Sequence, residues 1–456
     1  MTAATTELAP LHRRTGAPAE RRPTILVRAA LMAGAIVVLA MWWTDAATAS
    51  VTSPAQLADI VGELAGMLGG YLVCAQVLLI ARVPWFEAAV GMDKLVRWHR
   101  TLGTSVVLLI VTHVGLMLLG GMLLDNATPW AEIFTILRSY PDMLAAFLGT
   151  AAFIAVGFSS VRLLRRYLSY EVWYWLHLTT YGAIFLTFLH QLSAGVNFVN
   201  NPANRVIWLL LYLGTASAVL TWRIVLPTVA AWRHRMRIDR IVAESSGTVS
   251  VWLTGKNLEG RGVKAGHFML FRFMSWGHLL TAHPYSISRV PEAGALRITV
   301  GALGDHSRLV RDLRPGTLVF AEGPFGHFTA ERASRKRILL IAGGAGIGPI
   351  RALAEDMITR GHDVVLLYRA RSADHLALLN ELQSMRGLTL VPVPGRREEL
   401  GYDPLSAPAL GRLVPDVAQR EVFICGPGAM ARQAESSLRR LRVPGRLIHH
   451  EELSMS

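Results

Sequence analysis

Four histidines in the first half of the chain have the residue type and spacing of metal ligands. His99 and His113 lie 14 residues apart in one apolar stretch, and His177 and His190 lie 13 residues apart in another. An ionisable side chain inside a bilayer is costly, so its presence indicates a function. At about 1.5 Å per residue, each spacing separates two histidines by roughly 20 Å along a helix, which places one histidine in each leaflet.

Two such helices side by side would form two stacked pairs, His99 with His177 and His113 with His190. Each pair can clamp an iron between two imidazoles, and a porphyrin suits the apolar interior of a helical bundle. The alternative is four histidines that only form hydrogen bonds between helices. Two matched pairs at leaflet spacing favour two b-type haems.

The helical repeat constrains how the second helix can serve both pairs. A step of 14 residues returns to within ~40° of the same helix face, whereas a step of 13 residues misses it by ~140°. We therefore expect a local twist near Gly182, or two haems that are contacted from different sides of that helix.

The composition of the chain is that of a membrane protein with additional domains. With 456 residues, 52% of them hydrophobic, and a mean hydropathy of +0.37, the chain is too apolar for an ordinary soluble protein and long enough for about three domains. Its two cysteines, Cys74 and Cys425, exclude a four-cysteine iron–sulfur cluster and a disulfide framework. The net charge of +14 could indicate nucleic acid, but many arginines flank apolar segments. We expect a lipid bilayer as the partner and no nucleic acid.

Six apolar segments predict a membrane-spanning helical bundle over residues 26–228, after a disordered cytoplasmic head over 1–25. The first segment could instead be a signal-peptide core before Ala47-Thr48-Ala49, but we favour an anchor. Basic residues gather in alternate loops, which predicts an integral protein of the cytoplasmic (plasma) membrane with both termini in the cytoplasm. The expected spans are Ile25–Trp43, Leu57–Ile80, Thr101–Leu124, Met143–Leu164, Val172–Leu192 and Val206–Leu226.

After residue 228 the helical pattern gives way to shorter elements. Residues 229–332 contain short alternating strands separated by glycine and proline, which predicts an antiparallel β-barrel. Residues 333–456 alternate strand and helix, which predicts a doubly wound α/β nucleotide-binding domain. The predicted fold class is therefore an all-α six-helix membrane bundle, followed by these two domains.

A glycine-rich turn opens the first helix of the predicted α/β domain. Glycines let the backbone approach a pyrophosphate, and the helix N-terminus offers free N–H groups. Proline in the last place departs from the strict GxGxxG pattern, so this turn alone is a weak signal. Its sequence is Gly343-Gly344-Ala345-Gly346-Ile347-Gly348-Pro349.

Four further motifs occur around this turn at domain-scale intervals, and together they resemble the ferredoxin reductase-type flavoprotein module. With the four histidines added, the chain from about residue 57 resembles the ferric reductase/NADPH oxidase superfamily of transmembrane flavocytochromes. The motifs are His283-Pro284-Tyr285-Ser286-Ile287-Ser288, Gly304-Asp305-His306-Ser307, Gly323-Pro324-Phe325-Gly326 and Cys425-Gly426-Pro427.

The resemblance implies roles for individual residues. Tyr285 would lie against the isoalloxazine of FAD, and Ser286 would hydrogen-bond near the flavin N5 that receives hydride. Cys425 would border the nicotinamide ring, so these three are the expected catalytic residues. The further FAD-binding residues would be His283 and Pro284 near the ribityl–phosphate arm, and Gly304 and Ser307 at the pyrophosphate. The nicotinamide nucleotide would contact Gly343, Gly344, Gly346, Ile347, Gly348, Pro349, Gly426 and Pro427.

Two features bear on the choice of nucleotide. Arg369 and Arg371 follow the second strand of the α/β domain, where an adenosine ribose would lie; two guanidiniums suit a 2′-phosphate, so NADPH is preferred over NADH. The alternative is a solvated basic loop. Relatives of this kind end in a segment whose aromatic ring covers the flavin, whereas this chain ends without one, leaving Leu453 or Met455 as a looser lid.

The resemblance implies an NAD(P)H-dependent transmembrane oxidoreductase. It would pass electrons from cytoplasmic NAD(P)H through FAD and two haems to an acceptor outside the cytoplasm. The His-x12-His spacing resembles the NADPH oxidase branch, so oxygen, reduced to superoxide, is slightly preferred over a ferric or other metal chelate. A haem electron-carrier subunit with a vestigial reductase half is a further alternative. No obligate protein partner is indicated.

Overall fold

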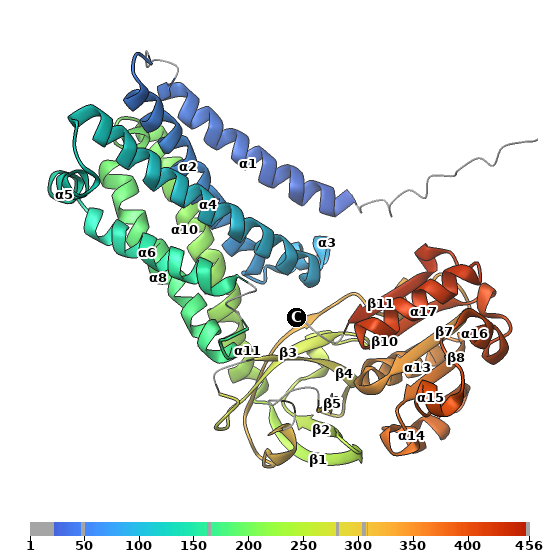
Figure 1. The fold of residues 1–456 in the computed structure, drawn as a ribbon. Coiled ribbons are helices and arrows are strands. Elements are labelled where there is room, and N and C mark those ends of the chain that lie inside the picture. The colour runs from blue at the N-terminus through green and yellow to red at the C-terminus, as the bar shows by residue number, and fades with distance from the viewer. Residues whose placement is uncertain are drawn as a thin grey trace, which may run out of the picture.

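A helical region is joined to two sheet-containing units in the computed structural model (Figure 1). The structure describes residues 22–46, 51–161, 166–279, 282–302, 307 and 309–452. The head predicted over 1–25 lies mostly outside these residues. The helical region runs from Arg22 to His234, and the sheets follow it directly.

Long apolar helices build the first region. Among the described residues, five helical segments are long and apolar enough to cross a membrane: α1, α2, α4, α6 and the continuous run from α10 to α11. The remaining predicted span, α8, has the length but not the hydropathy, since it carries His177, His190 and Gln191; the count of six spans stays a prediction. The helices are α1 (Arg22–Ala46), α2 (Pro54–Ile80), α3 (Pro84–Val90), α4 (Met92–Asp125), α5 (Pro129–Ser139), α6 (Met143–Ser160), α8 (Tyr170–Ala194), α9 (Val196–Val199), α10 (Pro202–Val219), η1 (Leu220–Val225, a π-helix) and α11 (Leu226–His234).

Local sequence fixes where several of these helices begin. The Ser53 hydroxyl accepts a hydrogen bond from the Gln56 N–H at the start of α2, and Ser169 does the same for α8 through the Val172 N–H. These caps satisfy N–H groups that have no partner inside the helix. The helix α2 then packs along α4, and α6 packs along α8, which places the two histidine-bearing helices in one bundle.

The first sheet is antiparallel, with strand order β1-β2-β5-β4-β3-β6. Its edge strands meet at a bridge between Arg237 and Leu318, and the Val319 N–H donates to the Met236 carbonyl (2.8 Å). Alternating apolar residues over Thr248–Leu253, Phe268–Phe273, Leu296–Val300 and Leu318–Ala321 predict four strands, and these are present as β2, β3, β5 and β6. The strands β1 and β4 were not predicted, because proline and polar residues obscure the pattern in β4. The strands are β1 (Arg237–Ser245), β2 (Thr248–Thr254), β3 (Phe268–Phe273), β4 (His283–Glu292), β5 (Ala295–Gly301) and β6 (Val319–Phe325).

The second sheet is parallel, with strand order β11-β10-β7-β8-β9. Alternate residues of β7 enter two separate cores: Ile338 and Leu340 pack with α13, whereas Leu339 and Ile341 pack with α16 and α17. Helices on both faces confirm the predicted α/β domain. The elements are β7 (Arg337–Gly343), α13 (Ile347–Thr359), β8 (Asp363–Ala370), α14 (Leu379–Gln383), β9 (Leu388–Pro394), α15 (Arg397–Leu400), α16 (Ala407–Leu413), β10 (Glu421–Gly426), α17 (Gly428–Arg440) and β11 (Ile448–Glu452).

One helix of this domain is shorter than its sequence pattern predicts. The pattern predicts a helix over His375–Met385, but only α14 forms, because a 3-10 turn over Ala373–His375 and a left-handed backbone at Leu378 (φ 59°) precede it. The C-terminal segment, for which no strand was predicted, forms β11 and extends the sheet beside β10.

The segment between α2 and α4 contacts the first sheet. The Glu87 carboxylate in α3 accepts a hydrogen bond from the Gly326 N–H (3.1 Å), and His327 Nε2 donates to the Glu87 carbonyl (3.2 Å). Arg82 forms an ion pair with Glu322 of β6. The link between α2 and α4 is therefore held against the strand that carries the Gly323–Gly326 motif.

Candidate functional site

The two histidines nearer to the sheets face each other across the bundle. The ring centroids of His99 on α4 and His177 on α8 are 6.0 Å apart, with an angle of 76° between the rings. Two metal–nitrogen bonds of ~2 Å and about 1 Å from each nitrogen to its ring centre give roughly the same separation. The predicted pairing is therefore found, at a distance that suits one metal between two imidazoles.

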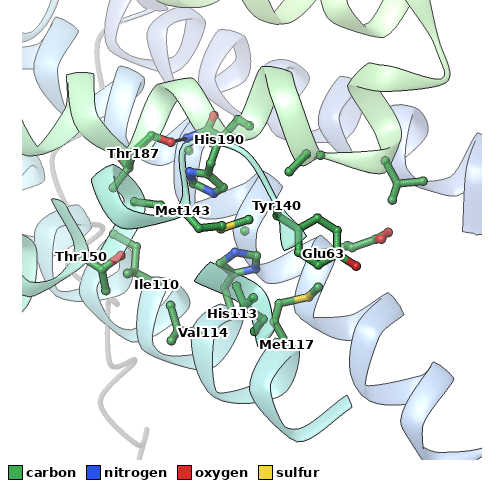
Figure 2. Close-up of a pocket in the computed structure, with 18 of the residues that line it drawn as sticks. Glu63, Ile110, His113, Val114, Met117, Tyr140, Met143, Thr150, Thr187 and His190 are labelled. Carbon is green, nitrogen blue, oxygen red and sulfur yellow. Dashed lines mark hydrogen bonds between the residues drawn. The ribbon is translucent and has the colours of Figure 1, made fainter. Parts of the chain in front are cut away.

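The second pair lines a cavity farther along the same helices. Both His113 and His190 lie on the wall of a cavity of about 490 Å³, and Figure 2 shows the two rings directed into it. Much of the remaining wall is apolar, including Ile110, Val114 and Met143. An apolar space between two imidazoles suits a porphyrin.

Hydrogen bonds fix the tautomers of the α4 histidines. His99 Nδ1 lies 3.0 Å from the Gln76 carbonyl, and His113 Nδ1 lies 2.8 Å from the Gly62 carbonyl. A carbonyl can only accept, so both Nδ1 atoms carry the proton. The Nε2 lone pairs are then free for a metal, as in histidine ligands whose other ring nitrogen donates to a backbone carbonyl. The Nδ1 atoms of His177 and His190 are buried without a hydrogen-bond partner among the described residues.

A glycine on α2 makes room for the His113 ring. A side chain at Gly66 of α2 would place its Cβ 2.7 Å from His113 Nδ1, so glycine is required where α2 meets that ring. The helix α8 is unbroken through Gly182, and the predicted twist is therefore not found. In an unbroken helix the 13-residue step turns His190 about 140° from His177 around the helix axis, which is the geometry of the other expectation; the two haems themselves stay a prediction.

The glycine-rich turn and the Cys425 motif meet at the carboxyl end of the parallel sheet. A Cβ at Gly346 would lie 2.2 Å from the Cys425 carbonyl oxygen, and one at Gly343 would lie 2.2 Å from the Met430 sulfur. Gly344 has φ +55°, a conformation that glycine adopts at little cost. The turn therefore lies against β10 at the edge where nucleotides bind in such sheets.

Three residues at the end of the glycine-rich turn also have packing roles. A Cβ at Gly348 would meet Thr299 Cβ at 3.3 Å and Ser288 Cβ at 3.6 Å, so this glycine allows α13 to approach β4 and β5 of the first sheet. Ile347 and Pro349 are buried in α13. The close domain contact therefore gives Gly348 a packing role, while its contact with a nucleotide stays a prediction.

The His-Pro-Tyr-Ser motif lies on β4, where it pairs with β3. Ser286 pairs in register with Phe268, and Tyr285 with Met269. The Tyr285 ring lies 6.3 Å from the ring of Phe271, and burial raises its phenolic pKa to about 12. The phenol therefore stays neutral and offers a flat face beside His283, whose ring centroid is 6.5 Å away.

Only some of the remaining residues predicted to contact FAD or the nucleotide lie within the described part of the chain. Gly304 lies outside the described residues, as do Leu453 and Met455. Ser307 is described and partly buried. Burial raises the pKa of the Cys425 thiol well above its usual value, so Cys425 is a neutral, packed side chain and not a nucleophile.

The two arginines expected at the ribose differ in their surroundings. Arg369 donates to the backbone carbonyls of Val393 and Gly395, which commits its guanidinium to holding the end of β9. Arg371 follows β8 and is exposed. The structure therefore leaves Arg371 as the better placed of the two for a 2′-phosphate.

Several residues with evident roles were not predicted. Glu87, which joins α3 to the Gly326 backbone, gave no sequence signal beyond its place in a loop between spans. Four carboxylates that line the outer cavity, Asp59, Glu63, Asp125 and Glu132, were also missed. Acidic residues at the ends of apolar segments could have indicated them.

Comparisons with known proteins match both halves of the chain. Residues 65–189 match the family described as "Ferric reductase like transmembrane component", and residues 340–436 match the "Oxidoreductase NAD-binding domain". The first match contains His99, His113 and His177 and ends one residue before His190, and the second contains the glycine-rich turn and Cys425.

Individual relatives resemble the second half. The ferredoxin reductase component of a 3-ketosteroid-9-alpha-monooxygenase from Mycobacterium tuberculosis is 29% identical over 208 residues, covering 41% of this chain and 53% of the relative. A plasma membrane-associated coenzyme Q6 reductase from Saccharomyces cerevisiae is 25% identical over 240 residues, covering 49% and 76%. The chain thus spans about half the length of the first relative.

A solved ferredoxin NADP+ reductase from Neisseria gonorrhoeae with bound FAD and NADP is 18% identical, with a TM-score of 0.41, and covers 49% of this chain and 99% of the other. The family matches, in contrast, place a ferric reductase-like transmembrane component before an oxidoreductase NAD-binding domain in one polypeptide. This order of domains fits a ferric reductase/NADPH oxidase-like architecture.

Proposed function

We propose that the protein is an NAD(P)H-dependent transmembrane oxidoreductase, which moves electrons from a cytoplasmic nucleotide to an acceptor on the other side of the membrane. The observation that carries this proposal is the pair of facing histidines at 6.0 Å, with a second pair in a cavity along the same helices. When bound, FAD would convert hydride into single electrons, and two b-type haems would relay them.

Residues of this chain hold the histidine rings in position and set their tautomers. The Gln76 and Gly62 carbonyls hold the His99 and His113 rings with Nε2 available as a ligand. The glycine-rich turn offers backbone N–H groups to a pyrophosphate, and the first sheet, as an FAD-binding barrel, offers Tyr285 and Ser286. The contact of Glu87 with Gly326 supports a fixed distance between the flavin unit and the nearer histidine pair.

We infer the direction of electron transfer from the contact between Glu87 and Gly326. The connection between α2 and α4 touches the first sheet, so His99 and His177 lie toward the reductase half, which we propose to be cytoplasmic. His113 and His190 share a cavity with Thr135 and Ile136 of α5, and α5 lies at the far end of the helical region (Figure 1). Oxygen and ferric species remain the two candidate acceptors beyond that pair.

Purified protein supplied with NADPH under anaerobic conditions tests the proposal. We expect a reduced Soret spectrum from two low-spin haems, and a change of His99 to Leu that removes one haem while NADPH still reduces the flavin. If H99L and H113L each retained two low-spin haems, the ligand assignment would be wrong. Haems that stayed oxidised under excess NADPH would favour an electron-carrier subunit instead.

A second assay distinguishes between the two candidate electron acceptors. Cytochrome c reduction that superoxide dismutase abolishes would indicate oxygen as the acceptor. Ferrozine-detected iron reduction that ignores the dismutase would indicate a ferric species.

A further inference from the structure

Two arginines are buried where α13 packs against β4, at the contact between the two sheet-containing units (Figure 1). Arg297 on β5 and Arg351 on α13 are each 3% exposed, although arginine is almost never fully buried unless it is paired. Both bind the carboxylate of Glu381 on α14: Arg297 Nη1 lies 2.8 Å from Oε2, and Arg351 Nη2 lies 2.7 Å from Oε1. A carboxylate of the second unit is thus shared between an arginine of each unit.

The same two arginines also meet at Ser288 of β4. Arg351 Nη1 donates to the Ser288 carbonyl (3.3 Å), and Arg297 Nε donates to the Ser288 hydroxyl (3.1 Å). The pairing of β4 with β5 shifts its register at Ser288, an irregularity of the kind that re-aims side chains next to active sites. These contacts close a ring that crosses between the units twice. We call it the arginine ring; its members are Ser288, Arg297, Glu381 and Arg351.

The arginine ring is attached to both elements to which the proposed function assigns hydride transfer. Ser288 lies two residues after Ser286, the residue expected at the flavin N5, which is roughly 7 Å along a strand. Arg351 lies five residues after Gly346 of the glycine-rich turn, which is about 7.5 Å along a helix. A Cβ at Gly348 would lie 3.6 Å from the Ser288 Cβ, so α13 approaches β4 closely here. The ring therefore holds β4 and the glycine-rich turn relative to each other.

The charges of the arginine ring suit orientation better than stability. Burial opposes ionisation of Glu381, but the hydrogen bond from Arg297 and the charges of the neighbouring arginines outweigh it and lower the pKa of this carboxyl. A buried salt bridge is often no more stabilising than apolar residues of similar volume. Arg351 Nε is also buried without a hydrogen-bond partner among the described residues, which a cluster built only for stability would avoid. Charged, directional hydrogen bonds instead specify one geometry.

We propose that Arg297, Arg351 and Glu381 are positioning residues for hydride transfer, which set the separation of nicotinamide and flavin by holding the second unit against β4. This inference rests on the proposed function, because it needs NADPH and FAD bound in the two units. Transfer requires the reacting atoms to lie about 3–3.5 Å apart, and the arginine ring limits the separations that the two units sample. Loss of the ring leaves both binding sites in place and makes the productive separation rarer.

Two glutamates that bind the same arginine provide a matched comparison. Glu355 also pairs with Arg351 (2.6 Å) but lies on the same helix, so E355Q removes a charge without breaking a contact between the units. Both carboxylates are partly exposed, so neither change leaves a fully buried amide. In the full-length protein, E381Q should slow flavin reduction at saturating NADPH by about tenfold in anaerobic stopped flow. Its Kd for NADPH, and both constants in E355Q, should change by less than about twofold.

The two constants separate positioning from a merely structural role. If the arginine ring only stabilised the fold, E381Q would lower the Tm and keep the wild-type rate at saturation, which overturns the proposal. The variant R297M/R351M/E381M replaces all three charged side chains with apolar ones, an exchange that often keeps or raises stability. It should retain FAD and still reduce its flavin about tenfold more slowly. A wild-type rate in this variant contradicts the proposal.

A distance measurement tests the arginine ring without any cofactor reaction. Cys74 and Cys425 are buried, so spin labels attach selectively to V242C on β1 and T359C at the end of α13, where both side chains are exposed. Pulsed EPR should give a narrow distance distribution for these labels in the otherwise unchanged protein and in E355Q, and a broader one in E381Q. A distribution that E381Q leaves unchanged overturns the proposal. Labels that respond to E381Q in a protein whose flavin NADPH does not reduce would support the ring and refute the proposed function.

Discussion

Replacing Gly346 with alanine tests whether the nucleotide site depends on contact between the glycine-rich turn and β10. The new Cβ would lie 2.2 Å from the Cys425 carbonyl oxygen, against a normal non-bonded contact of roughly 3.5 Å. Both sides of this contact are backbone, so no side chain can rotate away. The turn and the strand must therefore separate by about 1 Å.

The expected loss follows from this displacement. A misplacement of ~1 Å in a positioned site can reduce a rate by about 100-fold, which corresponds to about 2.7 kcal/mol in activation free energy. Gly346 has φ −61°, which alanine adopts freely, so backbone strain does not contribute. We expect flavin reduction by NADPH, measured by anaerobic stopped flow, to slow about 100-fold while FAD content is retained.

Two further substitutions calibrate this result. G343A meets the Met430 thioether, a flexible side chain, so its effect should stay below about tenfold. G411A in α16 would place its Cβ 3.6 Å from Leu441, an ordinary contact, and should leave the flavin reduction rate unchanged. A G346A protein that reduces its flavin at the wild-type rate would falsify the close-approach argument.

Three other predictions concern the reductase half. R371A should raise the KM for NADPH about tenfold and leave NADH unaffected, whereas R369A should lower the Tm, because it frees the end of β9; the reverse pattern would reassign the 2′-phosphate site. E87A should slow electron transfer from flavin to haem by about tenfold without changing flavin reduction, and unchanged haem reduction kinetics would show that α3 does not position the flavin unit. Burial and Lys264 lower the pKa of His267 to about 4, below the ordinary 6.5. Its contribution to the free energy of unfolding is thus present above pH 6.5 and is lost as pH falls toward 4, by up to about 2 kcal/mol given its partial exposure. H267Q should flatten that pH dependence in denaturant titrations, and an unaltered slope would reject the assignment.

Local sequence signals were sufficient for the main elements. Apolar length predicted five of the spans, because it is a property of one segment. The alternation of strands with helices predicted the α/β domain, because each of these elements has its own local pattern. The spacing of the four histidines predicted their pairing, because the interval along each helix sets the depth of each ring. Motif order predicted the reductase module, since glycine and proline at turns are local requirements.

Contacts between distant segments required the tertiary structure. Asp59, Glu132 and Asn197 lie far apart in the sequence, and nothing local shows that they share one cavity. The sequence likewise could not show that Gly348 makes room for β4 and β5 or that Arg369 is bound to backbone carbonyls, because each depends on which surfaces meet after folding. Periodicity and motif order along the chain determined the elements and the pairing of the histidines. Packing between helices and domains decided the charge of the outer cavity and the division of roles among the glycines and arginines.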